Sequence, residues 1–340
     1  MSARWIIETK FDPPRQHSRQ IERRHLFDRL VERAGDPIIV QAAAGFGKST
    51  LLAQWARALA SAGTSVAWLN LDEDDGQVDQ FVAYIVEAFR RALGTAAERE
   101  TIFSASSGLP PKAALSLMLS EVARQRRTVA LVLDDYHRAE NDEIDALMRG
   151  FLERATPLVR IAIATRTQPR LGLTRLKVEN RLTLVTDREL RFNDGETSLF
   201  LAADMPRVDR QDWLRFANLA EGWPVALQFA RMWLGEGGDL AALSAASEVN
   251  DLGAYLSEQV FGTLSTDQQD FLLRTGPFEI ISEEIADAIG IERAGLRVRD
   301  LARSALPITI LSQEPVRFRY HHLLQDFLLA RARTEDVDLA

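Results

Sequence analysis

The hydrophobic residues in the first half of this chain are grouped into five short runs that are rich in β-branched residues and carry few charges. These runs are Pro37–Ala42, Ser65–Asn70, Thr128–Asp134, Val159–Thr165 and Leu182–Thr186. Such runs are typical of strands that are buried on both faces of a parallel sheet. Between them, apolar residues recur at helical spacing in Thr50–Ala60, Val78–Leu93 and Lys112–Gln125. The alternation predicts an α/β domain in which helices cover both faces of a five-stranded sheet.

The pattern changes after about residue 190, where strand-like runs give way to short helical segments. These segments are interrupted at Gly195, Pro206 and Gly222–Pro224. Pro224 suits the first turn of a helix over Val225–Leu234, because proline has no N–H for a helix to leave unpaired. The sequence GEGGD at Gly235–Asp239 then predicts a flexible joint.

A third region begins near Asp251 and ends in a pattern that predicts a β-hairpin. Ser265 and Gln268 fit a capping box for a helix that reaches Arg274. The further elements expected are helices at Ser282–Ile289 and Ile291–Ser304, strands at Ile308–Leu311 and Val316–Tyr320 around SQEP, and a helix at His321–Arg333. Helices followed by a hairpin favour a winged-helix fold. We therefore predict three domains, at 1–190 (α/β), 191–250 (helical) and 251–340 (winged helix).

Composition narrows the class of protein. The 340 residues are 46% hydrophobic and 26% charged, which is ordinary for a globular chain of two or three domains. The absence of cysteine excludes disulfides, thiolate metal sites and a cysteine nucleophile. No secretory signal or membrane-spanning run is present, so we expect a cytoplasmic protein without a membrane partner. The net charge of -8 argues against direct contact with nucleic acid.

The strongest chemical signal is a P-loop between the first predicted strand and the helix that follows it. Glycines let backbone N–H groups turn toward phosphates, a lysine adds positive charge, and a serine hydroxyl can bind Mg²⁺. The predicted nucleotide-binding residues here are Ala44, Gly45, Phe46, Gly47, Lys48, Ser49 and Thr50. Ala42 stands where the usual pattern has its first glycine. The chain has only four lysines, and one of them lies at this position.

Acidic residues at the end of the third predicted strand complete a Walker B pattern. Asp134 is predicted to hold Mg²⁺ through water, and Asp135 to polarise the attacking water. Arg166 follows the fourth strand and is predicted to reach the γ-phosphate. We expect His137 to shape the loop after Walker B. Aspartate at the second acidic position reaches less far than glutamate, so the sequence predicts slow hydrolysis of ATP to ADP, suited to a switch.

Six segments occur in the order seen in STAND-class P-loop ATPases. They are AAAGFGKSTLLAQWA, VAWLNLDEDDGQVDQFVAYI, LVLDDYHRAEN, IAIATRTQPRLGLTRL, AEGWPVALQFA and FRYHHLLQDFL. From about Lys10 to Arg333 the chain most resembles the nucleotide-binding module of large ATP-binding LuxR-type transcription regulators, the family of the maltose-regulon activator.

The resemblance implies a fold and further site residues. The fold is a sheet of order 5-1-4-3-2 followed by a helical domain and a winged helix. Ile21 and Arg23 match a segment that contacts the adenine end of the nucleotide, and Pro224 matches a proline that lines the base pocket. His321 matches a winged-helix histidine that contacts the β-phosphate of ADP, with His322 as a second candidate. Trp223 is open to two interpretations, as a packing residue or as a base-stacking one.

The function implied by the resemblance is a regulatory switch. ADP keeps such a module closed and monomeric, whereas ATP and an inducer open it for self-association, and hydrolysis resets it. In the family, a helical-repeat sensor and a DNA-binding helix-turn-helix follow, so inducer and DNA are expected to act through regions outside this chain. The chain is then expected to be an excised module or a short member. The alternatives are a stand-alone P-loop enzyme, such as a small-molecule kinase, and an oligomerising signalling scaffold.

Overall fold

The structure of the protein is a computed structural model that describes residues 6–16, 20–33, 35–93, 108–155, 157–202, 217–218, 220–235, 251–302 and 306–335. Contacts divide the chain into two compact units, unit 1 at Met1–Ala42 and Lys48–Glu189 and unit 2 at Ala43–Gly47 and Leu190–Ala340. Five P-loop residues therefore pack with the second half of the sequence. Among the described residues, no helix is long and apolar enough to cross a bilayer.

Unit 1 is built on a parallel five-stranded sheet. Its strands are β1 (Ile38–Gln41), β2 (Ser65–Asn70), β3 (Val129–Asp134), β4 (Val159–Thr165) and β5 (Thr183–Thr186). They lie in the order β2-β3-β4-β1-β5, which confirms the predicted order read from its other edge. The predicted strands begin within one residue of those observed. Buried β-branched runs located them well because both faces of this sheet are covered.

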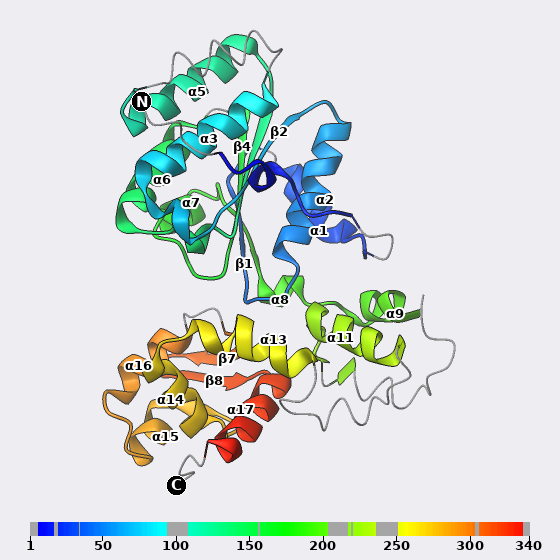
Figure 1. The fold of residues 1–340 in the computed structure, drawn as a ribbon, viewed down its shortest axis with the longest axis vertical. Coiled ribbons are helices and arrows are strands. Elements are labelled where there is room, and N and C mark those ends of the chain that lie inside the picture. Colours follow the sequence, from blue (N-terminus) through cyan, green and yellow to red (C-terminus); the bar gives the residue numbers. More distant parts are fainter. Residues whose placement is uncertain are drawn as a thin grey trace. The chain divides into compact units, whose positions relative to one another are not determined.

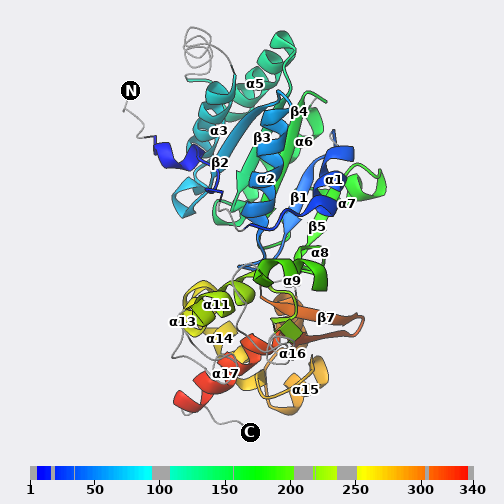
Figure 2. The same cartoon turned by 90° about the vertical axis from the view of Figure 1, so that its right-hand side faces the viewer.

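Helices cover the sheet in two layers, which Figures 1 and 2 show from two sides. On one face lie α3 (Val78–Ala92), α5 (Pro111–Gln125) and α6 (Asp142–Arg154), and on the other α1 (Arg24–Glu32) and α2 (Lys48–Ser61). The three predicted helices are confirmed as α2, α3 and α5. The sequence analysis missed α6, which begins at Asp142. It is capped by Asn141, whose side chain accepts hydrogen bonds from the N–H groups of Glu143 and Ile144. The remaining elements of unit 1 are η1 (Glu8–Phe11), η2 (Glu73–Gly76), η3 (Tyr136–Arg138), α7 (Leu173–Val178) and α8 (Asp187–Leu190).

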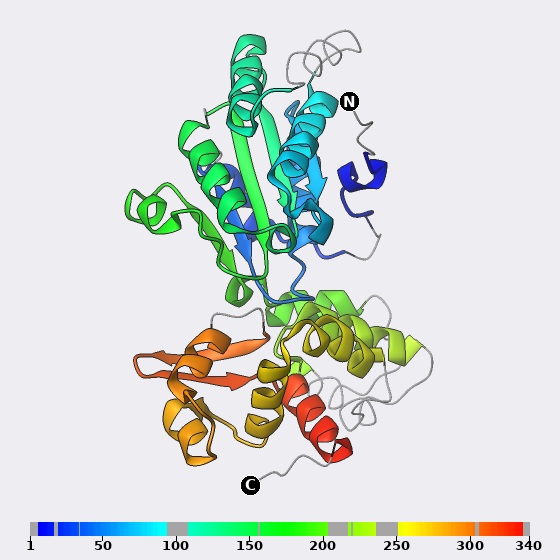
Figure 3. The same ribbon diagram turned by 60° about the vertical axis from the view of Figure 1, so that its left-hand side comes forward.

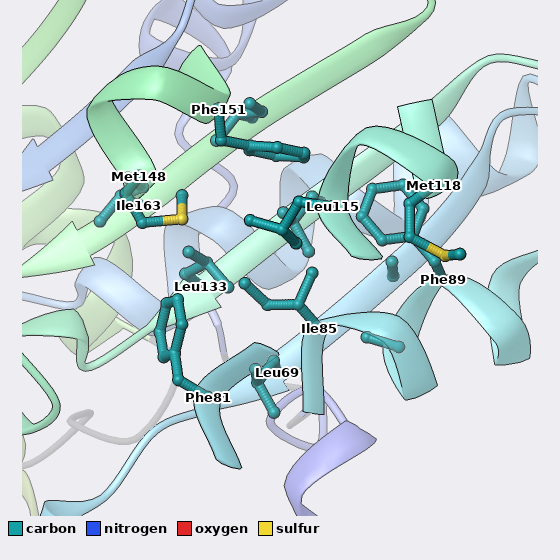
Figure 4. Close-up of a cluster of buried hydrophobic side chains, with 14 of the residues drawn as sticks. Leu69, Phe81, Ile85, Phe89, Leu115, Met118, Leu133, Met148, Phe151 and Ile163 are labelled. Carbon is teal, nitrogen blue, oxygen red and sulfur yellow. The ribbon is translucent and has the colours of Figure 1, made fainter. Parts of the chain in front are cut away.

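The larger core of unit 1 lies between the sheet and the α3–α5–α6 layer (Figure 4). Phe81, Ile85 and Phe89 of α3 are fully buried there, one turn apart, as their helical spacing predicts. Leu69 and Leu133, from neighbouring strands, meet them from the sheet. This packing fixes the carboxyl end of β3, from which the Walker B acids extend.

The N-terminal segment is held to unit 1 by a buried ion triad. Lys10, in η1, places its Nζ 2.7 Å from Asp72 Oδ2 and 2.6 Å from Asp75 Oδ2. Asp75 is completely buried, and Lys10 is only 6% exposed. The Lys10 ammonium also lies 4.7 Å from the centre of the Tyr84 ring on α3. The triad thus joins the start of the chain to the edge of the sheet next to β2.

Unit 2 contains a series of helices and an antiparallel sheet. Its helices are α9 (Asp194–Ala202), α11 (Pro224–Gly235), α13 (Asp251–Gln259), η4 (Phe261–Thr263), α14 (Thr266–Thr275), α15 (Glu283–Ala288), α16 (Ala294–Ala302) and α17 (His322–Thr334), and its strands are β6 (Ile281–Ser282), β7 (Ile308–Gln313) and β8 (Val316–Tyr320). In Figure 3 the orange strands β7 and β8 lie side by side, and the red helix α17 follows them. The hairpin and the Ser265–Gln268 capping box are confirmed. Because part of the 191–250 region is not described, the boundaries of the three predicted domains stay a prediction.

Several predicted helix starts in unit 2 differ from those observed. The helix expected from Ser282 begins at Glu283, because the Ser282 side chain caps it. The helix expected from Ile291 begins at Ala294, because Arg293 has a left-handed backbone with φ of 55° that cannot belong to a right-handed helix. The last helix begins at His322, because the His321 side chain caps it instead of joining it. Pro206 and most of the joint expected at Gly235–Asp239 lie outside the described residues.

A polar cluster ties the winged-helix region to the start of α11. His321 is 1% exposed, its Nε2 donates a 3.0 Å hydrogen bond to the Ala220 carbonyl, and its Nδ1 accepts one from the Leu323 N–H. Beside it, the Glu221 carboxylate forms ion pairs with Arg191 and Arg319 at 3.0 and 2.8 Å, and His322 Nε2 lies 3.2 Å from one of its oxygens. Burial lowers the pKa of His321 to about 4, so the ring is neutral at physiological pH.

We predict that Lys10→Met destabilises the protein by about 3 kcal/mol, because it leaves the buried Asp75 carboxylate without its cation. Urea unfolding measures this free energy. Lys177→Met is the matched control, since Lys177 is exposed on α7, and should change stability by less than about 0.5 kcal/mol. Equal stabilities for the two variants would show that the triad contributes nothing.

We also predict that His321 makes the protein lose stability as the pH falls from 6.5 toward 4. A histidine whose folded pKa is lowered stabilises the fold above its unfolded pKa, and that contribution disappears as the unfolded chain takes up the proton. Between pH 7.5 and 5 the loss should be about 2 kcal/mol.

Denaturant unfolding of wild type and His321→Asn at both pH values tests this, because every other titrating group is common to the two chains. Asparagine keeps a side-chain oxygen to cap α17. The variant should have the shallower pH dependence, whereas His25→Asn, at an exposed position on α1, should retain the wild-type slope. The same slope in wild type and His321→Asn would contradict the prediction.

Candidate functional site

The P-loop has the strained backbone that its sequence predicts. Gly45 and Gly47 adopt φ of 76° and 80°, which side chains other than glycine rarely tolerate. The Ala44 carbonyl accepts a 3.1 Å hydrogen bond from the Trp223 indole, and the Gly45 carbonyl accepts one of 3.2 Å from the Val225 N–H. A Cβ atom on Gly45 would lie 2.4 Å from Val225 Cγ1, so glycine is also required by close packing. In the described chain, the N–H groups of Gly45 and Gly47 have no acceptor, which suits an anion.

Lys48 begins α2 with its side chain folded into the site. It is 6% exposed, and its Nζ donates a 2.9 Å hydrogen bond to the Ala42 carbonyl. Burial lowers the pKa of Lys48 to about 8, with Asp135 and Asp134 opposing the effect and Arg166 adding to it. These effects place Lys48 in electrostatic range of the three charged side chains among the predicted catalytic and metal-binding residues. A phosphate bound here would stabilise the ammonium form and raise the pKa of Lys48 again.

Ser49 and Asp134 lie together, as a shared Mg²⁺ would require. Ser49 Oγ donates a 2.9 Å hydrogen bond to Asp134 Oδ1, which also accepts one of 3.1 Å from the Asp135 N–H. Burial and the neighbouring Asp135 charge raise the pKa of Asp134 to about 6, so this carboxylate lacks a sufficient counter-charge. The two oxygens fit a hard cation, and no group of three or more acidic, histidine or cysteine ligands exists among the described residues. Mg²⁺ bound here would therefore take its other ligands from water and phosphate.

The remaining predicted residues lie on several elements. Arg166 directly follows β4, and its charge acts on Lys48. Thr50 lies in the first turn of α2 and is partly exposed. Ile21 accepts a 2.9 Å hydrogen bond from Gln54 of α2 through its carbonyl, and buried Arg23 donates one of 2.9 Å to the Glu189 carbonyl. The adenine-side residues therefore hold the segment before α1 against unit 1, and their role toward a base stays a prediction.

Trp223 is a packing residue in this structure. It is completely buried, with its ring centre 6.1 Å from that of Phe46 and 5.0 Å from that of His321. Phe46 is itself only 1% exposed, so both rings belong to the core of unit 2. Pro224 is the first residue of α11, as predicted. Pro224 lies between Trp223 and Val225, and both of these hydrogen-bond to the P-loop.

His321 differs from its predicted arrangement, because both of its ring nitrogens are already used within unit 2. Contact with a phosphate would require it to release the Ala220 carbonyl. The sequence analysis missed Glu221 as the centre of a cluster that includes two arginine ion pairs and the nearby His322 ring. The sequence signal was weak, because Glu221 only precedes a glycine and no local pattern predicts that Arg191 and Arg319 meet it.

Comparisons with known proteins agree with this geometry. Residues 17–163 match the AAA ATPase domain family, and residues 257–340 match the MalT winged helix domain family. The serine/threonine-protein kinase PknK of Mycobacterium tuberculosis (strain ATCC 25618 / H37Rv) is 30% identical over 95% of this chain and 30% of its own length. The HTH-type transcriptional regulators MalT of Cronobacter sakazakii and Serratia proteamaculans are 26% and 28% identical over 97% of this chain and 37% of their own length.

The chain therefore spans about a third of the length of the relatives it matches. The predicted resemblance is confirmed in its two parts, since the ATPase match contains the P-loop and Walker B residues and the winged-helix match contains His321. The chain carries an AAA ATPase domain followed by a MalT winged helix domain, and it resembles the ATP-binding module of the MalT-like, LuxR-type transcription regulators.

Proposed function

We propose that this chain is an ATP/ADP-binding regulatory module that hydrolyses ATP slowly and self-associates in its ATP-bound state. The observation that carries the proposal is the buried group of Lys48, Ser49 and Asp134. Burial disfavours the charged forms of Lys48 and Asp134, and a phosphate and Mg²⁺ would supply the opposite charges. Lys48 and the P-loop N–H groups bind the phosphates. Ser49 and Asp134 hold Mg²⁺, which neutralises charge on the phosphates when it is bound.

Hydrolysis is assigned to the residues at the ends of β3 and β4. Asp135 polarises the attacking water, and Arg166 contacts the γ-phosphate and so distinguishes ATP from ADP. Ile21, Arg23 and Pro224 are assigned to the base. His321 is assigned to the β-phosphate of ADP, which it can contact only in a state where its Nε2 leaves the Ala220 carbonyl.

The relatives support a regulatory role. One is named a serine/threonine-protein kinase and others HTH-type transcriptional regulators, yet both kinds match this chain over at least 95% of its length. A module shared by proteins with different named activities is expected to control those activities. Inducer and DNA are then expected to bind regions outside this chain, and the cytoplasm is its expected location.

A kinase is the second candidate, because one relative carries that name. The two functions differ in what receives the γ-phosphate. Incubation with ATP labelled at the γ-position distinguishes them: a switch releases labelled inorganic phosphate, whereas a kinase transfers the label to an added acceptor. Transfer to an acceptor beyond water would overturn the proposed switch.

We predict that Lys48→Ala weakens binding of ADP by about 100-fold, the loss expected when a buried charge-assisted contact is removed. Calorimetric titration measures the affinity. Lys112→Ala, at an exposed position on α5, should bind as the wild type does. Asp135→Asn should retain binding but lose turnover, which in the wild type should stay below about 10 s⁻¹. Unchanged affinity in Lys48→Ala would mean that the site is assigned wrongly.

We predict that Asp135→Asn with Mg²⁺ and ATP sediments as a larger species than the same variant with Mg²⁺ and ADP. The substitution keeps ATP intact, so the two samples differ only in the γ-phosphate. Analytical ultracentrifugation at a fixed protein concentration measures the difference. Identical sedimentation coefficients would contradict nucleotide-dependent self-association while leaving ATP binding intact.

A further inference from the structure

The loop after β3 carries a histidine with an unpaired ring nitrogen. His137 lies in η3, two residues beyond Asp135, and its side chain is 15% exposed. Its Nδ1 is buried and has no hydrogen-bond partner among the described residues. The nearest carboxylate oxygen, Asp135 Oδ1, is 4.0 Å away, which is too far for a direct hydrogen bond. A buried polar atom without a partner is costly, so its presence calls for an explanation such as a catalytic role or an ordered water.

The backbone of this loop is strained in a way that fixes Asp135 and His137. Asp135 has φ of 54° and ψ of 39°, in the left-handed region that aspartate rarely adopts. The turn is locked by a 3.0 Å hydrogen bond from the Arg138 N–H to the Asp135 carbonyl. Between the two residues, Tyr136 is completely buried and donates a 2.7 Å hydrogen bond to Asp145 Oδ1. Strain that is held this firmly is typical of functional sites.

His137 lies in the electrostatic field of the phosphate-binding residues. Burial lowers the pKa of His137 to about 4, with Asp135 opposing the effect and Arg166, Lys48 and Arg138 adding to it. The imidazole is therefore neutral at physiological pH, with one ring nitrogen able to accept a hydrogen bond. When its proton lies on Nε2, the acceptor is the buried Nδ1, which is the nitrogen near Asp135.

We propose that His137 is a positioning residue that holds the water attacking the γ-phosphate, together with Asp135. This inference rests on the proposed ATP hydrolysis. Because Nδ1 is covered in this structure, a water can reach it only when neighbouring atoms move as the nucleotide binds. A water about 2.8 Å from both Nδ1 and Oδ1 would then have the two acceptors at an angle of about 90°, because they are 4.0 Å apart. That angle is close to the one between the two O–H bonds of water. The water then donates one hydrogen to each acceptor, and its lone pair is left to attack phosphorus.

The proton balance assigns different roles to the two acceptors. As the water oxygen bonds to the γ-phosphorus, the bond from phosphorus to the bridging oxygen of ADP breaks. One water proton passes to the Asp135 carboxylate and from there to the product phosphate or solvent. The other proton stays on the new phosphate hydroxyl, and Nδ1 only accepts a hydrogen bond from it. Asp135 is thus the base, and His137 orients the nucleophile.

The test compares His137→Asn with His137→Leu in the full chain. Asparagine places its Oδ1 near the position of Nδ1 and still accepts a hydrogen bond, whereas leucine fills similar space without an acceptor. Steady-state ATP hydrolysis gives turnover and KM, and calorimetric titration gives the affinity for ADP. His25→Leu is the matched control, because it makes the same substitution at an exposed position on α1.

We expect His137→Leu to lower turnover by about 100-fold while the affinity for ADP stays within about 3-fold of wild type. His137→Asn should retain turnover within about 10-fold, and His25→Leu within about 3-fold. Equal losses in the leucine and asparagine variants, or a parallel loss of ADP affinity, would overturn the inference, because His137 would then only support the loop. If the wild type hydrolyses ATP and His137→Leu does so at the same rate, only the inference about His137 is overturned. If the wild type binds ATP without hydrolysing it, the proposed hydrolysis is overturned as well.

Discussion

The structure depends on two hydrogen bonds that hold the P-loop from outside, from the Trp223 indole to the Ala44 carbonyl and from the Val225 N–H to the Gly45 carbonyl. Each hydrogen bond contributes about 1 kcal/mol to stability, but its effect on the orientation of the loop backbone matters more for the site. They occupy the Ala44 and Gly45 carbonyls and so fix the path of the loop, while the N–H groups of Gly45 and Gly47 remain for a phosphate. The loop that binds phosphate therefore takes its shape from residues almost 180 positions later in the sequence. The missing Cβ of Gly45 is what permits Val225 to approach so closely.

The same contacts continue into the winged-helix region of unit 2. The Ala220 carbonyl accepts hydrogen bonds from the Trp223 N–H, at 2.7 Å, and from His321 Nε2, at 3.0 Å. The His321 ring also packs edge-on against the Trp223 indole, which in turn holds Ala44. A displacement of His321 would therefore remove one partner of the carbonyl that fixes Trp223. This chain of contacts gives the proposed switch a physical route, because a phosphate that competes for His321 also changes what supports the P-loop.

Electrostatics within unit 1 also favour a site that responds to a bound nucleotide. Burial lowers the pKa of Lys48 to about 8 and raises that of Asp134 to about 6, so both groups titrate close to neutral pH. A phosphate favours the charged lysine, and Mg²⁺ favours the charged aspartate. The free energy released when both charges are matched adds to the affinity for the nucleotide. A site that is electrostatically incomplete when empty is thus suited to report whether a nucleotide is bound.

The sequence predicted the elements whose signals are local, and it failed where the signal lies in distant residues. Buried β-branched runs located all five strands, and the order of strand, glycine loop and helix located Lys48, Ser49 and Asp134. Helix α6 was missed because its first turn holds three acidic residues and so resembles a solvated loop after Walker B. Arg191, Glu221 and Arg319 are separated by about 30 and about 100 residues, and no periodicity connects them. His321 shows the limit most clearly, since one histidine can cap a helix, hold a carbonyl or bind a phosphate, and only its neighbours in space decide between these roles.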